Sequence, residues 1–429
     1  MLTLRGLTLL VVAVVLWAVG RILGVPEMFV LAAASAALVP MAAVAVRMSS
    51  ASMAVRRRLS TSRLAAHAQA EVEIMLRNDS RLPSSLLLVQ DHCPPALVEQ
   101  PPRFVVPGLR RGGTDPGSTV ALSYLVTGAR RGRHVIGPLT LRVRDPFGLV
   151  ERVRRYHSTT DLLVHPEVEA LPPSLSRGAA AGSGSSAERR LLNAGDEFYT
   201  MREYVSGDDL RQVHWPSTAH RRKLMVRQQE MPWQAQATVL LDTRASLHLG
   251  HGPDSTLDRA VSAVASLAAH LVAGRYDLRL VTADQDRAPA PQPLAVMLDR
   301  LAEVEATSAR SLAPLLTRLR TSGAADGLLA VVLGAPPVGG PGLAQEPDVR
   351  SLLLAARGRS GRLCVIVDRY RGPTSAISPA SDLAALLRGG GWQAVVVAPG
   401  QALGPALAAS LPAARRTFVG GARPGSAHT

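Results

Sequence analysis

Two long apolar runs begin the chain and predict a pair of membrane-spanning helices. Residues 7–23 are apolar apart from Thr8 and Arg21, and residues 28–46 are apolar apart from Ser35. The second run has 19 residues, close to the roughly 20 that an α-helix needs to cross the hydrocarbon core of a bilayer. With a tight turn between the runs, we expect a transmembrane helical hairpin and its basic flank in residues 1–60.

Positive charges beside both helices predict the orientation of this hairpin. Arg5 precedes the first run, and five arginines follow the second: Arg47, Arg56, Arg57, Arg58 and Arg63. Basic residues concentrate on the cytoplasmic side of membrane spans. We therefore expect a protein of the inner, or plasma, membrane whose soluble domains face the cytoplasm. The alternative is a cleaved signal peptide with Arg5 in its basic region, which the second apolar run disfavours.

Residues 61–170 show the short alternation that is typical of β-strands. Val72, Ile74 and Leu76 alternate with Glu71, Glu73 and Met75 before a turn-forming Asn-Asp-Ser sequence. Further short apolar runs lie at residues 86–90, 104–106, 120–126, 139–143 and 162–165. We predict an immunoglobulin-like β-sandwich. The Ser-, Gly- and Ala-rich residues 171–192 indicate a flexible linker.

From residue 237 onward, continuous apolar runs alternate with helical periodicity. The runs cover residues 238–242, 278–282, 328–333, 363–367 and 394–397, and residues 257–273 have apolar positions at helical spacing. This alternation predicts a doubly wound α/β domain with a mostly parallel sheet over residues 237–412, followed by a disordered tail over residues 413–429. Ligands of such sheets bind at the carboxyl ends of the strands.

Residues 193–236 combine charged, aromatic and turn residues without a simple hydrophobic period, and we call them the signature segment. Residues 207–209, Gly-Asp-Asp, indicate a turn and a helix N-cap. We expect a short helix through His214 that ends at Pro216, and an extended stretch over residues 224–227.

The signature segment is also our candidate interaction site. We expect Trp215 to be buried and the charged residues to form an ion network that joins the two soluble halves while presenting a partner surface. The candidate residues are Arg202, Glu203, Tyr204, Gly207, Asp208, Asp209, Arg211, His214, Trp215, Lys223 and Arg227.

A family resemblance begins in this segment. The order Arg-Glu-Tyr-Val-x-Gly-Asp-Asp-x-Arg-x-x-His-Trp over residues 202–215, with Lys-Leu-Met-Val-Arg over residues 223–227, resembles bacterial domain-of-unknown-function family fifty-eight. Residues 145–149, Asp-Pro-Phe-Gly-Leu, also resemble a motif of that family, and their residue types indicate a structural turn. At Pro216 and Ser217 the chain departs from relatives, which carry a lysine there.

The resemblance implies a membrane-anchored protein with a C-terminal von Willebrand factor A-like domain and no established reaction. Relatives are commonly encoded beside MoxR-type AAA+ ATPases, which implies such an ATPase as a protein partner. This inference rests on association and not on any residue of the chain.

Residues 242–246, Asp-Thr-Arg-Ala-Ser, occupy the place of the Asp-x-Ser-x-Ser motif that binds Mg²⁺ in von Willebrand A domains. Arg244 replaces a hydroxyl ligand with a permanent cation, and no acid follows the strand at residues 328–333. We therefore expect a degenerate metal-site loop of Asp242, Arg244 and Ser246, with an Arg244–Asp242 ion pair and no metal.

Composition narrows the class of function. The net charge is +15, but the arginines are scattered and only five Phe and six Tyr are available to stack bases, so we expect no nucleic-acid partner. No nucleophile elbow or phosphate-binding loop is present, so we expect no enzymatic activity and no cofactor. The predicted function is a membrane-tethered protein-interaction or assembly factor. The alternatives are a metal-dependent ligand-binding domain, and a hydrolase that uses Asp208, Asp209 and His214.

Overall fold

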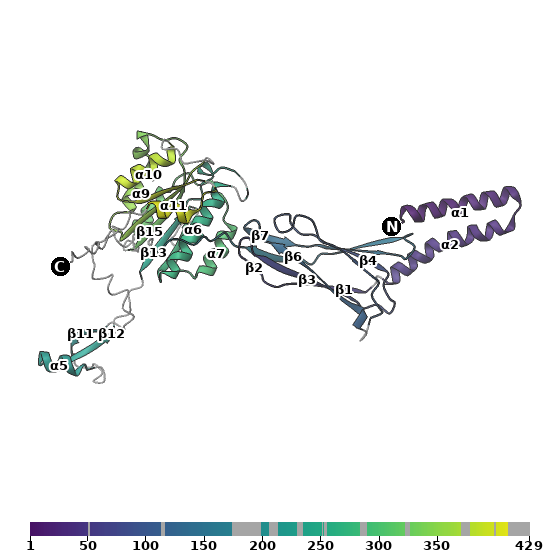
Figure 1. Ribbon diagram of the computed structural model, residues 1–429, viewed down its shortest axis with the longest axis horizontal. Helices are drawn as coiled ribbons and strands as arrows, with labels where there is room; N and C mark the ends of the chain where they lie inside the picture. Colours follow the sequence, from purple (N-terminus) through teal and green to yellow (C-terminus); the bar gives the residue numbers. More distant parts are fainter. Residues whose placement is uncertain are drawn as a thin grey trace, which may run out of the picture. The chain divides into compact units, whose positions relative to one another are not determined.

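The computed structural model in Figure 1 describes most of the chain and divides it into two compact units. The first unit comprises Met1–Glu167 with Leu298–Val304, and the second comprises Val168–Met297 with Glu305–Thr429. The described residues are 1–49, 52–112, 116–173, 199–205, 213–229, 235–250, 252, 255–283, 290–321, 327–369, 378–398 and 400–410. Most of the predicted linker and the whole predicted tail lie outside them.

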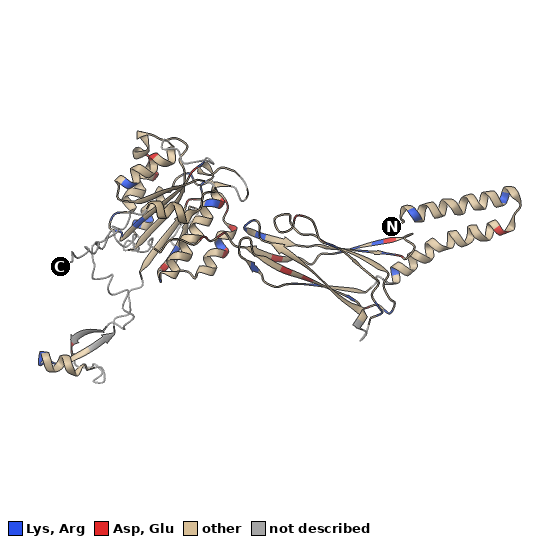
Figure 2. Cartoon of the chain, in the orientation of Figure 1, with Lys and Arg blue, Asp and Glu red and all other residues tan. Residues whose placement is uncertain are grey.

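Two apolar helices form the beginning of the first unit, as predicted. Helix α1 (Leu4–Leu23) starts at the N-cap Thr3 and stops at Gly24, whose φ of 69° ends it, and α2 (Pro26–Ser49) follows at once. Both helices are long and apolar enough to cross a membrane, and most of their residues are exposed. They run side by side in Figure 1, and Figure 2 shows their charges only near the helix ends.

The rest of the first unit is built mainly from β-strands. The strands are β1 (Met53–Leu59), β2 (Arg63–Leu64), β3 (Gln69–Asn78), β4 (Leu86–Asp91), β5 (Arg103–Val106), β6 (Thr119–Thr127), β7 (Gly132–Ile136), β8 (Leu139–Arg144), β9 (Glu151–Tyr156) and β10 (Thr160–Val164). They make three sheets with the orders β1-β3-β6, β2-β10-β7 and β5-β4-β8-β9. Each strand predicted for this region is present.

Strand β1 lies within residues 1–60, which we predicted as the hairpin and its basic flank. It pairs antiparallel with β3, with Met53 opposite Asn78 and Leu59 opposite Val72. Successive side chains of a strand point to opposite faces, so arginines can alternate between solvent and interior. Arg57 accordingly turns inward and pairs with the fully buried Asp91, whereas Arg56 and Arg58 are exposed.

The β1-β3-β6 sheet packs against both other sheets of the β domain. One core joins Ile74 and Leu76 of β3 to residues of β4 and β8, including Leu87 and Leu141. A second core joins Val72 of β3 to residues of β7 and β10. In β3 every second residue is buried and the residues between them are exposed or half-buried, so one face of the strand supplies both cores. The buried set also includes the polar Asn78.

The second unit contains a five-stranded parallel sheet, as predicted for a doubly wound α/β domain. Its order is β14-β13-β15-β16-β17, from β13 (Gln236–Leu241), β14 (Asp277–Thr282), β15 (Leu328–Gly334), β16 (Gly361–Val367) and β17 (Gln393–Val397). The helices of this unit are α6 (Thr256–Ala273), α8 (Ala313–Thr321), α9 (Pro347–Ala355), α10 (Pro379–Gly389) and α11 (Leu403–Ser410). Helix α7 (Leu294–Glu303) starts in this unit, and its residues from Leu298 onward belong to the first. The strand order reverses direction between β13 and β15.

The described part of the signature segment forms a small two-stranded sheet and a short helix. Strand β11 (Tyr199–Glu203) pairs antiparallel with β12 (Met225–Gln229), and α5 (Trp215–Arg221) lies between them in sequence. The predicted extended stretch is confirmed by β12. The predicted helix end is wrong, because α5 begins at Trp215 and has Pro216 in its first turn, where a missing N–H removes no helical hydrogen bond.

Candidate functional site

The candidate site lies at the carboxyl edge of the parallel sheet, beside its switch point. Asp242 directly follows β13, and Gly334 ends the neighbouring β15. In doubly wound sheets the helices leave neighbouring strands in opposite directions at such a point and open a crevice for ligands. The side chains that follow β13 and β15 are therefore the first place to look for function.

An ion pair occupies the end of β13. Arg244 donates from Nε to Asp242 Oδ1 over 2.9 Å and from Nη2 to Oδ2 over 2.8 Å, so the guanidinium and the carboxylate form a bidentate pair. Asp242 is fully buried and Arg244 is only 7% exposed. The predicted Arg244–Asp242 pair is confirmed.

A second carboxylate, Asp348 at the start of α9, also pairs with Arg244. Its Oδ1 atom accepts hydrogen bonds from Ser311 Oγ at 2.5 Å, Leu312 N at 2.9 Å and Ala313 N at 3.1 Å. These N–H groups begin α8, so Asp348 caps that helix while it binds the arginine. Burial opposes the charge on Arg244, but the two carboxylates outweigh it and raise the pKa of Arg244.

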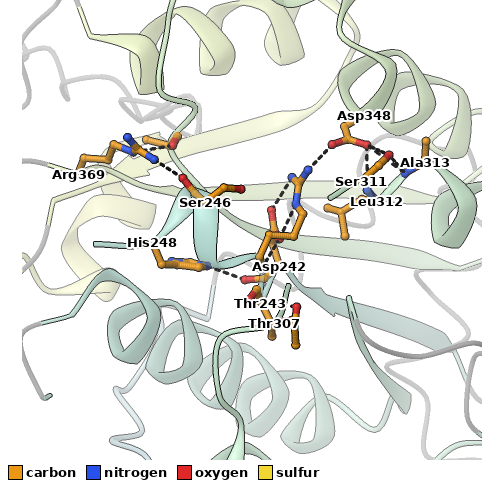
Figure 3. A network of polar contacts seen from close by, with 12 residues as sticks. Asp242, Thr243, Ser246, His248, Thr307, Ser311, Leu312, Ala313, Asp348 and Arg369 are labelled. Carbon is orange, nitrogen blue, oxygen red and sulfur yellow. Dashed lines mark hydrogen bonds and ion pairs between the residues drawn. The ribbon is translucent and has the colours of Figure 1, made fainter. Parts of the chain in front are cut away.

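Figure 3 shows the polar contacts that extend this network on both sides. His248 Nε2 donates to the Asp242 carbonyl at 2.7 Å, and burial lowers the pKa of His248, which keeps the ring neutral at pH 7. Arg369 donates to the Ser246 carbonyl at 2.5 Å. The hydroxyls of Thr243 and Thr307 lie 3.1 Å apart. Three separate loops are thereby joined at the sheet edge.

An apolar cavity of about 260 Å³ opens next to this network, and we call it the edge pocket. Its wall contains Leu247, Leu312, Leu316, Leu333 and Leu352. Arg244, Glu346 and Asp348 supply its polar lining. The lining residue Val338 is 72% exposed, which is unusual for a large aliphatic side chain beside an apolar cavity.

The donor set does not fit a hard divalent cation. Such an ion needs about six oxygen ligands. Both oxygens of Asp242 already accept from Arg244, which brings a permanent cation to this carboxylate. Ser246 supplies an exposed hydroxyl in the same loop. Within the described ranges, no group of three or more His, Cys, Asp or Glu side chains could hold a metal ion.

The structure describes only part of the candidate interaction set in the signature segment. Glu203 forms an exposed ion pair with Lys223 at 2.7 Å, and the Tyr204 N–H donates to the Leu224 carbonyl at 2.8 Å. The backbones of Arg202 and Arg227 belong to β11 and β12. Gly207, Asp208, Asp209 and Arg211 lie outside the described residues.

Trp215 is 68% exposed, so the prediction of its burial is wrong. Its position at the start of α5 turns the side chain away from the small core of Val213, Met225 and Val226, which are at most 8% exposed. His214 is the N-cap of the same helix: its Nδ1 accepts from Ser217 N at 3.3 Å and also lies 2.8 Å from Ser217 Oγ. These contacts orient the His214 ring within α5.

Sequence reasoning missed Asp348 and Thr307. Asp348 lies 104 residues after Arg244 and follows a proline in the first turn of a helix, where acids are common for local reasons. Thr307 lies 64 residues after Thr243 in a stretch without periodicity. Neither residue carries a local signal that points to the sheet edge.

Comparison with known families supports the resemblance over part of the chain. Residues 200–313 match the family model described as "Protein of unknown function DUF58". The match covers β11, α5, β12 and the chain as far as the start of α8, and thus includes Arg244. No curated protein matches the chain.

Solved structures are similar to this chain only at a low level. The CARDB domain of the PF1109 protein from Pyrococcus furiosus is 15% identical with a TM-score of 0.20, over 26% of this chain and 92% of that domain. A cohesin module of a family 33 glycoside hydrolase from Clostridium perfringens is 9% identical with a TM-score of 0.19, over 26% and 98%. The alkylpurine DNA glycosylase AlkC from Pseudomonas fluorescens is 11% identical with a TM-score of 0.18, over 32% and 38%. Scores this low support no inference about fold or function.

Proposed function

We propose that this chain is a membrane-tethered, non-enzymatic factor that binds an apolar segment of a partner protein in the edge pocket. The hairpin α1–α2 supplies the membrane tether, and the α/β domain, which we take to be von Willebrand factor A-like, supplies the binding surface. The β domain, which we take to be immunoglobulin-like, connects the two in sequence. The edge pocket is the observation that carries the proposal.

The size of the edge pocket selects the class of ligand. Its volume of about 260 Å³ is below the range of roughly 300–1,000 Å³ that is typical of small-molecule and cofactor sites. An apolar cavity of about 150 Å³ accommodates benzene, so the pocket has room for one aromatic or two small aliphatic side chains. A protein segment that inserts such side chains fits this space.

The charge network explains why binding would not need a metal. In a metal-dependent domain the ion supplies the charge that receives an acidic partner residue. Here Arg244 occupies that position and its charge is already balanced by Asp242 and Asp348. Recognition therefore depends on the apolar wall and on backbone contacts at the rim. Following the family resemblance, we propose a MoxR-type AAA+ ATPase as the partner.

Recovery of the ATPase with the full-length protein from membranes, with the ATPase held in its ATP state, tests this function. We expect Val338→Asp to abolish recovery, because a charge at the pocket wall opposes insertion of an apolar side chain. Val296→Asp is the matched control, since Val296 is 47% exposed on α7 and does not line the pocket.

Chelation of divalent ions should leave recovery of the ATPase unchanged. The ATPase must for this purpose be trapped with a covalently attached nucleotide analogue that needs no metal, so that the chelator acts only on the proposed interface. Equal recovery with Val338→Asp and the unmodified protein would refute the edge pocket as the binding site. Loss of recovery on chelation would favour the metal-dependent alternative.

A further inference from the structure

The loop of residues 145–150, which we call the interface loop, is joined directly to the start of α1. Leu2 pairs with Val150 in an antiparallel bridge, and Thr3 N donates to the Leu149 carbonyl at 3.0 Å. Thr3 Oγ1 lies 2.6 Å from the Gly148 carbonyl, to which it donates. The β domain thus contacts α1 at the start of its apolar sequence, although the interface loop and α1 are about 145 residues apart in the chain.

The interface loop also reaches between the two helices. Leu149 and Val150 pack in one apolar cluster with Val39 and Ala42 of α2, and Leu9 and Leu10 of α1 contact the same cluster. A helix rises 1.5 Å per residue, so Leu9 lies about 8 Å beyond the first residue of α1. The tip of the β domain therefore lies beside the second turn of α1 and beside Val39 and Ala42 in the C-terminal half of α2.

Three residues permit this close approach and fix the conformation of the loop. Gly6 faces the loop, and a Cβ at this position would overlap the Leu149 carbonyl oxygen. Asp145, which is 2% exposed, accepts hydrogen bonds from Phe147 N at 3.0 Å and Val150 N at 2.6 Å. Gly148 adopts a φ of 70° that closes the turn. The loop is held in one conformation by its own residues.

The interface loop presents the exposed side chain of Phe147, and arginines lie beside the same loop. Phe147 is 64% exposed, although it lies in the same turn as the buried Leu149. Arg5 and Arg144 lie beside Gly148, and Arg144 also forms an ion pair with Glu151 at 2.8 Å. Arg47 lies in the last turn of α2, with its carbonyl 3.2 Å from Arg152 Nη1. An apolar side chain among arginines matches the boundary between acyl chains and anionic headgroups.

We propose that the interface loop is a second membrane contact, in which Phe147 inserts at the acyl–headgroup boundary and Arg5 contacts phosphates of anionic phospholipids. The inference rests on the proposed membrane insertion of the hairpin. It follows that the β domain sits directly on the bilayer surface, and that the hairpin and the interface loop together fix its orientation there.

Spin labels on the full-length protein in liposomes of phosphatidylglycerol and phosphatidylcholine test this contact. Single cysteines replace Phe147, Val135 or Val14, and collisions with oxygen and with a water-soluble nickel chelate report the depth of each label. The native Cys93 and Cys364 are buried, and burial raises the pKa of the Cys93 thiol to about 11, so both resist labelling.

The three positions separate the possible outcomes. Val14, which is 65% exposed on α1, reports insertion of the hairpin. Val135 lies on β7 and is 43% exposed. Strand β8, which is about 20 Å long, separates Val135 from the interface loop. We expect labels at 14 and 147 to favour oxygen, and the label at 135 to favour the nickel chelate. A label at 147 that behaves like the one at 135, with 14 inserted, overturns this inference alone. A label at 14 that stays in water overturns the proposed tether.

The phosphate contacts are tested by changing the charge on either side. Liposomes without phosphatidylglycerol, or the substitution Arg5→Gln, should shift the label at 147 toward water. Arg103→Gln is the matched control, because Arg103 is exposed on β5, opposite Gln90 and away from the interface loop. Equal depth in both lipid compositions and with Arg5→Gln would overturn the role of the headgroup phosphates.

Discussion

Arg244 is 7% exposed and keeps its charge because two carboxylates share it. Removing one partner of a buried ion pair leaves an uncompensated charge, whereas an exposed pair contributes little. Asp242 has no exposed surface, so it has no access to water as a substitute partner. The stability of the sheet edge thus depends on Arg244.

Arg244→Met should therefore destabilise the end of β13. We expect local opening to become easier by about 3–5 kcal/mol, because Asp242 would remain buried without a counter-ion. Hydrogen exchange of peptides from residues 236–246 in the full-length protein measures this change. Arg350→Met on α9 is the control, since Arg350 is exposed. Equal exchange in both variants would show that the pair contributes no stability.

Titration of the full-length protein with Mg²⁺ and Mn²⁺ should show no stoichiometric binding. Arg244→Ser restores one hydroxyl of the motif but not an acid on a later strand, so we expect weak affinity at most from this variant. Isothermal calorimetry decides the question. Stoichiometric binding by the unmodified protein that Asp242→Ala abolishes would contradict the assignment of Arg244 as the replacement for a metal.

His248 should make the α/β domain less stable in mild acid. Burial lowers the pKa of His248 in the folded protein below its ordinary value of 6.5. Below pH 6.5 the unfolded chain therefore binds more protons than the folded chain, and stability falls as the pH decreases toward the folded pKa. Thermal unfolding at pH 7.5 and 5.5 should differ less for His248→Gln than for the unmodified protein. The same difference in both proteins would exclude this residue as a cause.

At the scale of elements, Asp348 couples two helices to the end of a strand. It belongs to the first turn of α9, caps the start of α8 and pairs with the arginine that follows β13. A helix end contains N–H groups without an intrahelical partner, so its position depends on such an acceptor. The wall of the edge pocket, which includes residues of α8 and α9, is fixed by the same carboxylate.

Asp348→Ala should loosen the first turn of α8. We expect a loss of about 1–2 kcal/mol in local stability from the missing cap, measured by hydrogen exchange of peptides that begin at residue 312. Asp348→Asn retains one acceptor oxygen for the helix and should lose less. If both substitutions increase exchange equally, then the charge on Asp348, and not its capping geometry, stabilises α8.

At the scale of the whole molecule, the arginines beside the hairpin predict where the soluble domains lie. A C-terminal green fluorescent protein fusion should be fluorescent and a C-terminal alkaline phosphatase fusion inactive, because both ends of the hairpin remain in the cytoplasm. Alkaline phosphatase fused after Val25, between the two helices, is the matched control and should be active. Activity of the C-terminal phosphatase fusion would place the domains outside, and a mature N-terminus near Gly20 would indicate cleavage.

The sequence by itself determined those features that depend on near neighbours. Two apolar runs fix the hairpin, since runs of 17 and 19 nearly all apolar residues have few stable alternatives to a helix. Continuous or alternating apolar runs fix the five strands of the parallel sheet and six strands of the β domain, because burial requires these periods. The Arg244–Asp242 pair was also predictable, because its members are only two positions apart in the chain.

Contacts between segments that are far apart in the chain could be identified only from the folded structure. Asp348 and Thr307 reach the sheet edge because parallel strands bring their following loops together, and no local pattern encodes that meeting. Trp215 is exposed because α5 begins at this residue, one position before Pro216. From the sequence alone, Pro216 was equally compatible with the end of a helix. The contact of the interface loop with α1 links residues about 145 positions apart. Local periodicity specifies which segments are helices and strands, whereas the packing of their buried faces against one another specifies which side chains meet.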